Sequence, residues 1–236
     1  MRAIILAGGK GTRLRPYTTL IPKPLVPLGG EYSILEIIIM QLSKSGFTHI
    51  TLAVNHLSQL IMAYFGDGER LGVKIDYSLE EGELSTIGPL TLIDDLPENF
   101  LVMNGDILCD LNYKTFFDAH VDAGSRISVS AFRREVKIDF GVLRYDESGR
   151  LNEFQEKPEY DFDVSMGIYC MEPAILDLIP KGVPYGFDDL MRQMLRSGLP
   201  VYVYKHEGLW MDIGREEDFL KAQEIFMENH APILGL

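Results

Sequence analysis

Short apolar runs alternate with helical patterns along the chain, and this rhythm restricts the folds that it can adopt. Residues 3–7, 48–54 and 100–103 are predicted strands, because they are short and rich in apolar or β-branched side chains. Residues 33–36 match a capping box, which predicts a helix that begins there and stops at Gly46. Strands that alternate with helices indicate an α/β fold, an open, mostly parallel, Rossmann-like sheet with helices on both faces.

A predicted β-hairpin interrupts this rhythm. Residues 141–145 and 151–156 flank the turn sequence Glu147-Ser148-Gly149-Arg150. Such an insertion in an α/β chain suggests a lid or a separate substrate-binding region. The remaining elements are expected to be helices at 58–65, 113–123, 173–179, 188–197 and 216–229, and strands at 73–79, 127–132, 164–171 and 201–204.

The charge balance excludes one large class of partner. Lys and Arg total 22 against 35 Asp and Glu, a formal net charge of -13. A surface this acidic repels a phosphate backbone, so we expect no nucleic-acid partner. No apolar stretch approaches about 20 residues, so we expect no membrane span. Cys109 and Cys170 belong to no C-x-x-C pair and are predicted to be buried thiols, which favours a cytoplasmic protein.

A glycine-rich segment opens a long predicted loop over residues 8–32. Its sequence, Gly8-Gly9-Lys10-Gly11-Thr12-Arg13, lacks the Gly-x4-Gly-Lys-Ser/Thr pattern of a Walker loop. It also fails the dinucleotide-binding fingerprint, because Leu14 occupies the third glycine position. Glycines still allow backbone N–H groups to approach an anionic ligand closely. From the glycines alone, a flexible turn after a strand is the alternative.

Two cations lie in the same loop. Arg13 follows the glycines, and Lys23 lies between Pro22 and Pro24, which restrict its backbone. A cation on a stiffened segment is preorganised to stabilise developing phosphate charge. For a lone Lys, an exposed basic loop would be the better interpretation.

Two aspartates follow predicted strands. Asp106 comes just after the run at 100–103, and Asp212 is flanked by apolar residues in Trp210-Met211-Asp212-Ile213-Gly214. In open α/β sheets, ligands bind at the carboxyl ends of strands. Mg²⁺ prefers one or two carboxylates together with phosphate oxygens. Each aspartate alone could equally be a turn or N-cap residue.

Read together, residues 6–16 and Pro22-Lys23-Pro24-Leu25 resemble the signature of the sugar-1-phosphate nucleotidyltransferases, Gly-Gly-x-Gly-Thr-Arg-Leu-x-Pro followed by Pro-Lys-Pro-Leu. The resemblance implies transfer of a nucleotidyl group from a nucleoside triphosphate to a sugar 1-phosphate. It implies that Arg13 and Lys23 are catalytic and that Asp106 and Asp212 hold Mg²⁺. The nucleotide-binding residues that it implies are Leu6, Ala7, Gly8, Gly9, Gly11, Thr12, Arg13, Lys23, Glu80, Gly88, Asn104 and Gly105.

The sugar side rests on the same resemblance. Glu156-Lys157-Pro158 looks like the family's sugar-phosphate motif, and Gly141 and Gly167 match its close-approach glycines. Ser165 stands where the family usually has Asn, and a hydroxyl has less reach than an amide. All five positions, Gly141, Glu156, Lys157, Ser165 and Gly167, are predicted to bind the sugar phosphate.

The substrate prediction is more open than the reaction. Gly88-Pro89-Leu90 and the segment around Asp212 are similar to the mannose-1-phosphate guanylyltransferase branch, so GTP with mannose or a manno-heptose 1-phosphate is favoured. Ser85 replaces a usual glycine of the base-binding stretch, which keeps dTTP, UTP or CTP as alternatives. A non-catalytic nucleotide-sugar-binding subunit is a second alternative. A glycosyltransferase is disfavoured, because Asp106 is not part of an Asp-x-Asp motif.

The expected organisation is a single domain, 1–236. Its nucleotide-binding part covers about residues 1–110 and its sugar-binding part about 111–236. The left-handed β-helix of longer relatives is expected to be absent, and a homo-oligomer is compatible with this organisation.

Overall fold

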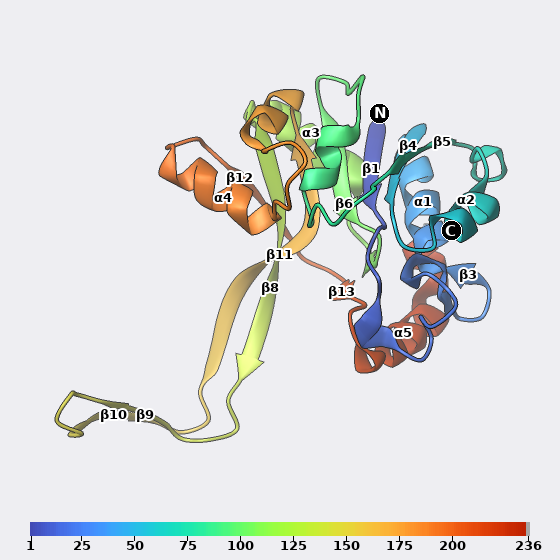
Figure 1. Cartoon of the computed structure of the whole chain (residues 1–236). Coiled ribbons are helices and arrows are strands. Elements are labelled where there is room, and N and C mark those ends of the chain that lie inside the picture. The colour runs from blue at the N-terminus through green and yellow to red at the C-terminus, as the bar shows by residue number, and fades with distance from the viewer. Residues whose placement is uncertain (235–236) are drawn as a thin grey trace.

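The computed structural model describes residues 1–234. Its centre is a seven-stranded sheet in which β1 lies between β6 and β4, both parallel to it (Figure 1). The predicted mostly parallel sheet is therefore confirmed, with one exception: β11 runs antiparallel to both of its neighbours. In spatial order the strands are β12 (Tyr202–His206), β8 (Ile127–Lys137), β11 (Glu159–Met171), β6 (Phe100–Asn104), β1 (Arg2–Leu6), β4 (His49–Val54) and β5 (Lys74–Leu79).

Helices cover both faces of the sheet, as predicted. Side chains alternate across a strand, so Ile5 points into one hydrophobic core and Ile4 into the other. The first core is closed by α1 (Ile34–Lys44), α2 (Ser58–Phe65), α3 (Tyr113–Ala123) and α5 (Glu216–Leu234). The second is closed by α4 (Phe187–Arg196) and the 3₁₀ helices η4 (Gly88–Leu92) and η5 (Pro173–Leu178). The helix predicted at 173–179 is thus a 3₁₀ helix.

Local signals at the start of α1 act as predicted. Ser33 Oγ accepts from the Glu36 N–H at 3.2 Å, and Glu36 Oε2 accepts from the Ser33 N–H at 3.4 Å. These bonds satisfy amide groups that a helix start would otherwise leave unpaired. They also direct the chain from the glycine-rich loop into the first core.

The long loop before α1 is more structured than predicted. It contains the 3₁₀ helices η1 (Thr12–Leu14) and η2 (Lys23–Leu25) and a two-stranded sheet, β2 (Pro27–Leu28) with β3 (Tyr32–Ser33). The prolines explain η2, because their fixed φ suits a helical first turn. Lys23 is therefore the first residue of a short 3₁₀ helix, which fixes its backbone.

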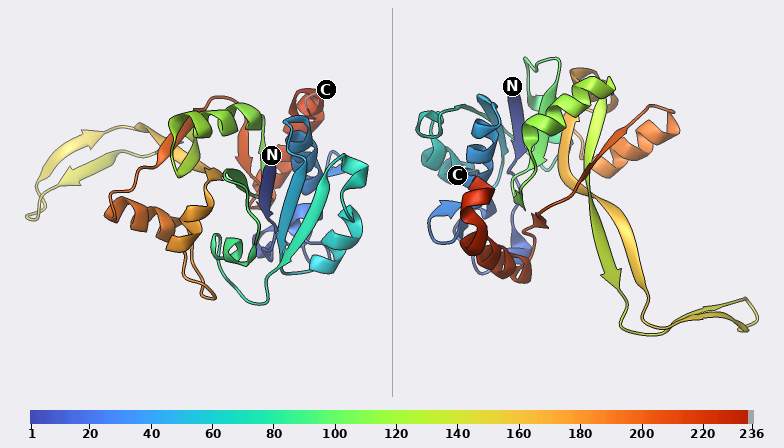
Figure 2. Two further views of the ribbon diagram at one scale, coloured as in Figure 1. Left: turned by 90° about the horizontal axis from the view of Figure 1, so that it is seen from above. Right: turned by 180° about the vertical axis from the view of Figure 1, so that it is seen from behind.

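The predicted hairpin is present as β9 (Val142–Tyr145) and β10 (Leu151–Gln155). It lies at the end of a two-stranded arm, the outer halves of β8 and β11, which projects from the body in every view (Figures 1 and 2). Both strands are longer than predicted, because their outer halves are polar and lack the apolar pattern used to place them. Cross-strand ion pairs join Lys137 to Glu159 at 2.7 Å and Arg133 to Asp161 at 3.1 Å.

Two further features are the state of the cysteines and the length of the helices. Cys109 and Cys170 are buried and not disulfide-bonded, as predicted. Within residues 1–234, no helix is both long and apolar enough to cross a lipid bilayer.

Candidate nucleotide and metal site

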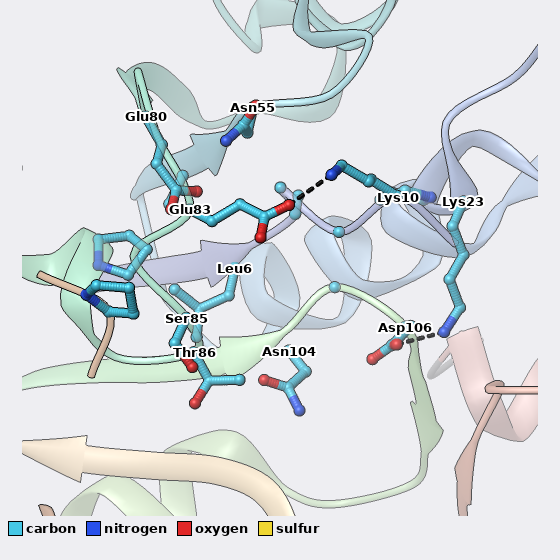
Figure 3. Close-up of a pocket in the computed structure, with 18 residues that line it drawn as sticks. Leu6, Lys10, Lys23, Asn55, Glu80, Glu83, Ser85, Thr86, Asn104 and Asp106 are labelled. Atoms are coloured by element: carbon cyan, nitrogen blue, oxygen red, sulfur yellow. Dashed lines mark hydrogen bonds and ion pairs between the residues drawn. The ribbon is translucent and has the colours of Figure 1, made fainter. Parts of the chain in front are cut away.

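A pocket of about 630 Å³ opens at the carboxyl ends of β1, β4 and β6 (Figure 3). This is the edge of an open α/β sheet at which ligands generally bind. Eight predicted nucleotide-binding residues line it: Leu6, Ala7, Gly8, Gly9, Lys23, Glu80, Asn104 and Gly105. The predicted metal ligand Asp106 lines it as well.

The first glycine of the loop is needed for close packing inside the pocket. A Cβ on Gly8 would lie 3.2 Å from both Asn55 Cβ and Glu80 Oε2. Gly11 serves the loop from outside the pocket: its φ is +60°, and its carbonyl accepts from Thr18 Oγ1 at 2.7 Å. Gly11, Thr12 and Arg13 do not line the pocket, whereas Gly8 and Gly9 form part of its wall.

Lys23 and Asp106 form an ion pair at one end of the pocket. Lys23 is almost completely buried, with 8% of its surface exposed. Asp106 Oδ2 takes the lysine, while Oδ1 is buried and has no hydrogen-bond partner among the described residues. A buried carboxylate oxygen without a partner is costly, so this atom is suited to a ligand.

A small sheet that was not predicted brings the second aspartate to the first. β7 (Ile107–Cys109) pairs with β13 (Trp210–Asp212), which places Asp212 opposite Ile107, and the Ile213 N–H donates to the Asp106 carbonyl at 3.0 Å. Burial and the nearby charge of Asp106 raise the pKa of Asp212, while the cations Lys23 and Arg13 act in the opposite direction. Arg13, Lys23 and Asp106 therefore all lie within electrostatic reach of Asp212.

These residues fit a divalent cation. Two carboxylates are close enough to repel each other, and one of them has an unsatisfied oxygen. Within residues 1–234 no group of three or more His, Cys, Asp or Glu side chains forms a complete protein cage. A site with two carboxylates that relies on substrate oxygens for its other ligands is the usual arrangement for Mg²⁺ at phosphates.

The pocket also contains lining residues that sequence reasoning missed. Glu80 Oε1 accepts from the Leu84 N–H, which ties the following loop to the pocket wall. Ser85 lines the pocket with φ +63°, a left-handed conformation that glycine adopts more readily than serine. The unpredicted lining residues are Lys10, Pro24, Ala53, Asn55, Glu83, Thr86, Pro89 and Pro184.

Gly88 does not line the pocket. It is buried behind it, where its N–H donates to the Tyr185 carbonyl at 3.2 Å and a Cβ would lie 3.0 Å from Leu84 Cβ. Gly88 thus allows the loop that carries Ser85 to pack closely. Among the missed residues, Asn55 had a usable signal, because it directly follows the predicted strand at 48–54.

None of the five predicted sugar-side residues lines the pocket. Gly141, Glu156 and Lys157 lie near the base of the hairpin, where a Cβ on Gly141 would lie 3.2 Å from Glu156 Oε2. Lys157 is exposed and has φ +46°. Ser165 lies nearer the body, and its Oγ accepts from the Gly167 N–H at 3.3 Å.

Gly167 connects the sugar side to the pocket. Its φ is +76°, and a Cβ there would lie 2.6 Å from Nδ2 of the pocket residue Asn104. Gly167→Ala should therefore displace Asn104 and lower the free energy of unfolding by more than the about 1–3 kcal/mol that backbone strain costs by itself. Urea denaturation would measure the loss. Gly149→Ala is the control, with φ +82° but no atom within 4 Å of its Cβ, and an equal loss there would remove the close-approach argument.

Asp212→Asn should stabilise the metal-free chain at neutral pH, although it removes one of the two carboxylates predicted to hold the metal. Because the pKa of Asp212 is raised in the folded chain, the wild-type free energy of unfolding falls as pH rises through the interval above the ordinary aspartate pKa of about 4. Asn cannot ionise, so the metal-free variant should gain melting temperature over wild type at neutral pH and none at acid pH. Asp212 is exposed as a whole residue although its carboxyl is partly buried, and water screens the charge, so the gain should be small. A variant that is less stable at neutral pH would contradict the repulsion.

Comparison with known proteins gives a consistent result. The nucleotidyl transferase family model matches residues 2–229. The chain is 36% identical to the UTP–glucose-1-phosphate uridylyltransferase of Synechocystis, covering 94% of this chain and 62% of that protein. It is also 36% identical to the mannose-1-phosphate guanylyltransferase catalytic subunit beta of Dictyostelium discoideum, covering 97% of this chain and 65% of that protein.

The chain thus spans somewhat less than two thirds of the length of these relatives. Among solved structures, HddC from Yersinia pseudotuberculosis superposes with a TM-score of 0.75 at 25% identity, covering 95% of this chain and 99% of that one. Its complex with GMP-PN superposes with a TM-score of 0.71. From the match over nearly its whole length and the agreement in fold, the chain belongs to the nucleotidyl transferase family, and its relatives are sugar-1-phosphate nucleotidyltransferases.

Proposed function

We propose that this chain transfers a nucleotidyl group from a nucleoside triphosphate to a sugar 1-phosphate, giving a nucleotide sugar and pyrophosphate. One observation carries the proposal: a single pocket at the carboxyl edge of the sheet gathers the glycine loop, Lys23 and Asp106, with Asp212 and Arg13 beside it. The family membership and the curated relatives support it.

The reaction proposed for this site is one displacement. An oxygen of the sugar phosphate forms a bond to the α-phosphorus, and the bond from the α-phosphorus to the pyrophosphate oxygen breaks on the opposite side. The glycine-loop backbone holds the triphosphate, and Lys23 and Arg13 stabilise the negative charge that moves onto the leaving pyrophosphate. The attacking phosphate is already anionic near neutral pH, so no side chain has to remove a proton.

Asp106 and Asp212 are proposed to hold Mg²⁺. When bound, the ion would neutralise phosphate charge and orient the reacting oxygens. Lys23 would then exchange its ion pair with Asp106 for contacts to phosphate. The buried lysine would thus pair with Asp106 in the empty site and with phosphate in the occupied site.

The sugar 1-phosphate is proposed to bind between the pocket and the arm. The arm extends past the same edge of the sheet at which β6 ends with Asn104 (Figure 1). Lys157 would pair with the sugar phosphate and Glu156 would accept from sugar hydroxyls, with Gly141 allowing close approach. Ser165 and Gly167 would form the side of this region nearest to Asn104.

GTP with a mannose or manno-heptose 1-phosphate is the proposed substrate pair. The Dictyostelium guanylyltransferase and the GMP-PN complex of HddC support it. The uridylyltransferase at equal identity keeps UTP, and with it dTTP and CTP, as the alternative.

Ser85→Gly should separate the cost of the backbone from the use of the hydroxyl. Glycine accepts φ +63° without strain, so the variant should raise the free energy of unfolding by about 1 kcal/mol. Ser85→Ala is the matched control, because it removes the hydroxyl and keeps the strain. If the hydroxyl contacts the base, both variants should change the ratio of kcat/KM for GTP and UTP. If neither changes it, base selection lies elsewhere in the pocket.

The function is tested by measuring pyrophosphate release from the four common nucleoside triphosphates plus dTTP with a panel of sugar 1-phosphates, in the presence of Mg²⁺. Release with one pair would identify both substrates. Binding of a nucleotide sugar without release from any pair would favour a non-catalytic subunit. The simultaneous presence of Arg13, Lys23, Asp106 and Asp212 supports catalysis, because binding alone does not require all four.

A further inference from the structure

The hairpin formed by β9, β10 and their turn, here called the arm tip (residues 142–155), sorts its side chains by face. Tyr145 pairs with Leu151 and Leu143 with Phe154, so these four apolar side chains share one face. A bulge just after Leu151 makes this possible. Leu151 and Phe154 are three residues apart and would point to opposite faces of a regular strand. The extra residue of the bulge turns both side chains to the same face.

The other face of the arm tip is polar. Arg144 lies opposite Glu153, and their side chains form an ion pair at 3.1 Å. Val142 and Gln155 form the last pair, at the base. The arm tip is therefore an amphipathic hairpin, a pattern that normally accompanies burial of the apolar face.

That apolar face is exposed. Leu143, Tyr145, Leu151 and Phe154 are 54%, 69%, 54% and 57% exposed. In three views the arm tip stands clear of the body (Figures 1 and 2). A two-stranded hairpin is at best marginally stable alone in water, and clustered exposed apolar residues mark interaction sites.

The arm keeps this face away from its own body. The pairing of β8 with β11 continues without interruption from Phe132 and Val164 outward, and the Ile138 N–H donates to the Pro158 carbonyl at 3.1 Å. The ion pairs of Lys137 and Arg133 across the arm reinforce it. The arm thus holds its tip away from the body, so that the apolar face is open to contact with another molecule.

We propose that the arm tip docks against the arm tip of a second copy of this chain, apolar face to apolar face, about a two-fold axis. Such an interface is self-complementary, as isologous dimers require. Charge favours this position: the chain carries a net charge of -13, but the arm tip contributes only two Arg against three acidic residues. Two copies of an acidic chain meet there with little repulsion.

The area available suits a weak, reversible contact. Each large aromatic side chain buries about 150–250 Å² when covered. With four large apolar side chains that are 54% to 69% exposed, each arm tip can remove a few hundred Å² from water, which is less than the roughly 800 Å² per partner of a standard interface. We therefore expect a dimer that dissociates on dilution.

The test is sedimentation velocity of the full chain from low to high micromolar concentration. Wild type should shift from monomer to dimer. Tyr145→Glu combined with Leu151→Glu places charges in the apolar face and should raise the dimer dissociation constant at least about 100-fold. Glu153→Gln is the matched control on the polar face and should remain dimeric. The melting temperature of the body should be the same in all three.

Three outcomes would overturn the proposal. Wild type could remain monomeric at every concentration. The double variant could dimerise as well as wild type, which would place the interface elsewhere. Hydrogen exchange could show protected arm-tip amides in a monomer, which would mean that the arm tip docks on its own chain.

Discussion

Asp106→Asn should reduce kcat for nucleotidyl transfer by at least about 1,000-fold. Asn keeps the size of the side chain but removes the negative charge that a divalent cation requires. The buried Oδ1 has no hydrogen-bond partner among residues 1–234, and in the variant an amide nitrogen, which does not bind a cation, would take its place while the amide oxygen faces Lys23. Steady-state pyrophosphate release across a Mg²⁺ titration is the measurement, and added Mg²⁺ should not restore the rate.

Asp110→Asn is the matched control. Asp110 lies four residues further along, and its Oδ1 accepts from the Leu209 N–H at 2.7 Å and pairs with His206 Nε2 at 2.9 Å. Its role is to join the ends of β7 and β13, so its loss should lower stability and leave kcat within a few-fold of wild type. Equal losses of kcat in both variants would contradict the special role of Asp106.

Lys23→Met should lower kcat by about 100- to 1,000-fold, the usual cost of removing a preorganised charge that stabilises the transition state. Met fills the space of the lysine stem, so most of the packing of this buried side chain survives. The variant should also lose stability, because Asp106 is left without its ion-pair partner. Rapid-quench single-turnover rates would measure the chemical step, and denaturation would measure the stability.

Lys10→Met separates the two lysines of the pocket. Lys10 is exposed and forms an ion pair with Glu83 at 2.5 Å across the pocket (Figure 3). Water and salt screen the charge of an exposed lysine, so this variant should change KM for the nucleotide by only a few-fold. If Lys10→Met lowered kcat as far as Lys23→Met, burial and the contact with Asp106 would not explain the role of Lys23.

Local signals were sufficient for much of the fold. Ser33 and Glu36 cap α1 through bonds that span three residues, so their pattern is legible in the sequence. The helices at 58–65 and 113–123 were predicted with the observed bounds, because a full amphipathic or capped stretch carries its own boundaries. The arm was underestimated, because its polar outer strands are held by cross-strand ion pairs that no local pattern records.

The site residues likewise fall into those that a local motif predicts and those that only the fold brings together. The glycine loop, Lys23 and Asp106 were identifiable because each belongs to a contiguous motif. Glu83 and Thr86 were missed because they reach the pocket from the loop between β5 and η4, which no local motif marks, whereas Asn55 could have been found as the residue that follows β4. The left-handed φ of Ser85 is likewise a property of the folded loop.

By itself, the sequence determined the α/β class, the family resemblance and the identity of the charged groups, because periodicity, capping and motifs act over a few neighbouring residues. Only the tertiary structure decided which of these groups meet. The pairing of β7 with β13 brings Asp212 to Asp106 across about 100 residues of chain, and Gly167 reaches Asn104 only through the antiparallel β11. Such contacts depend on strand order and register, which are set by how the whole chain buries its apolar surface.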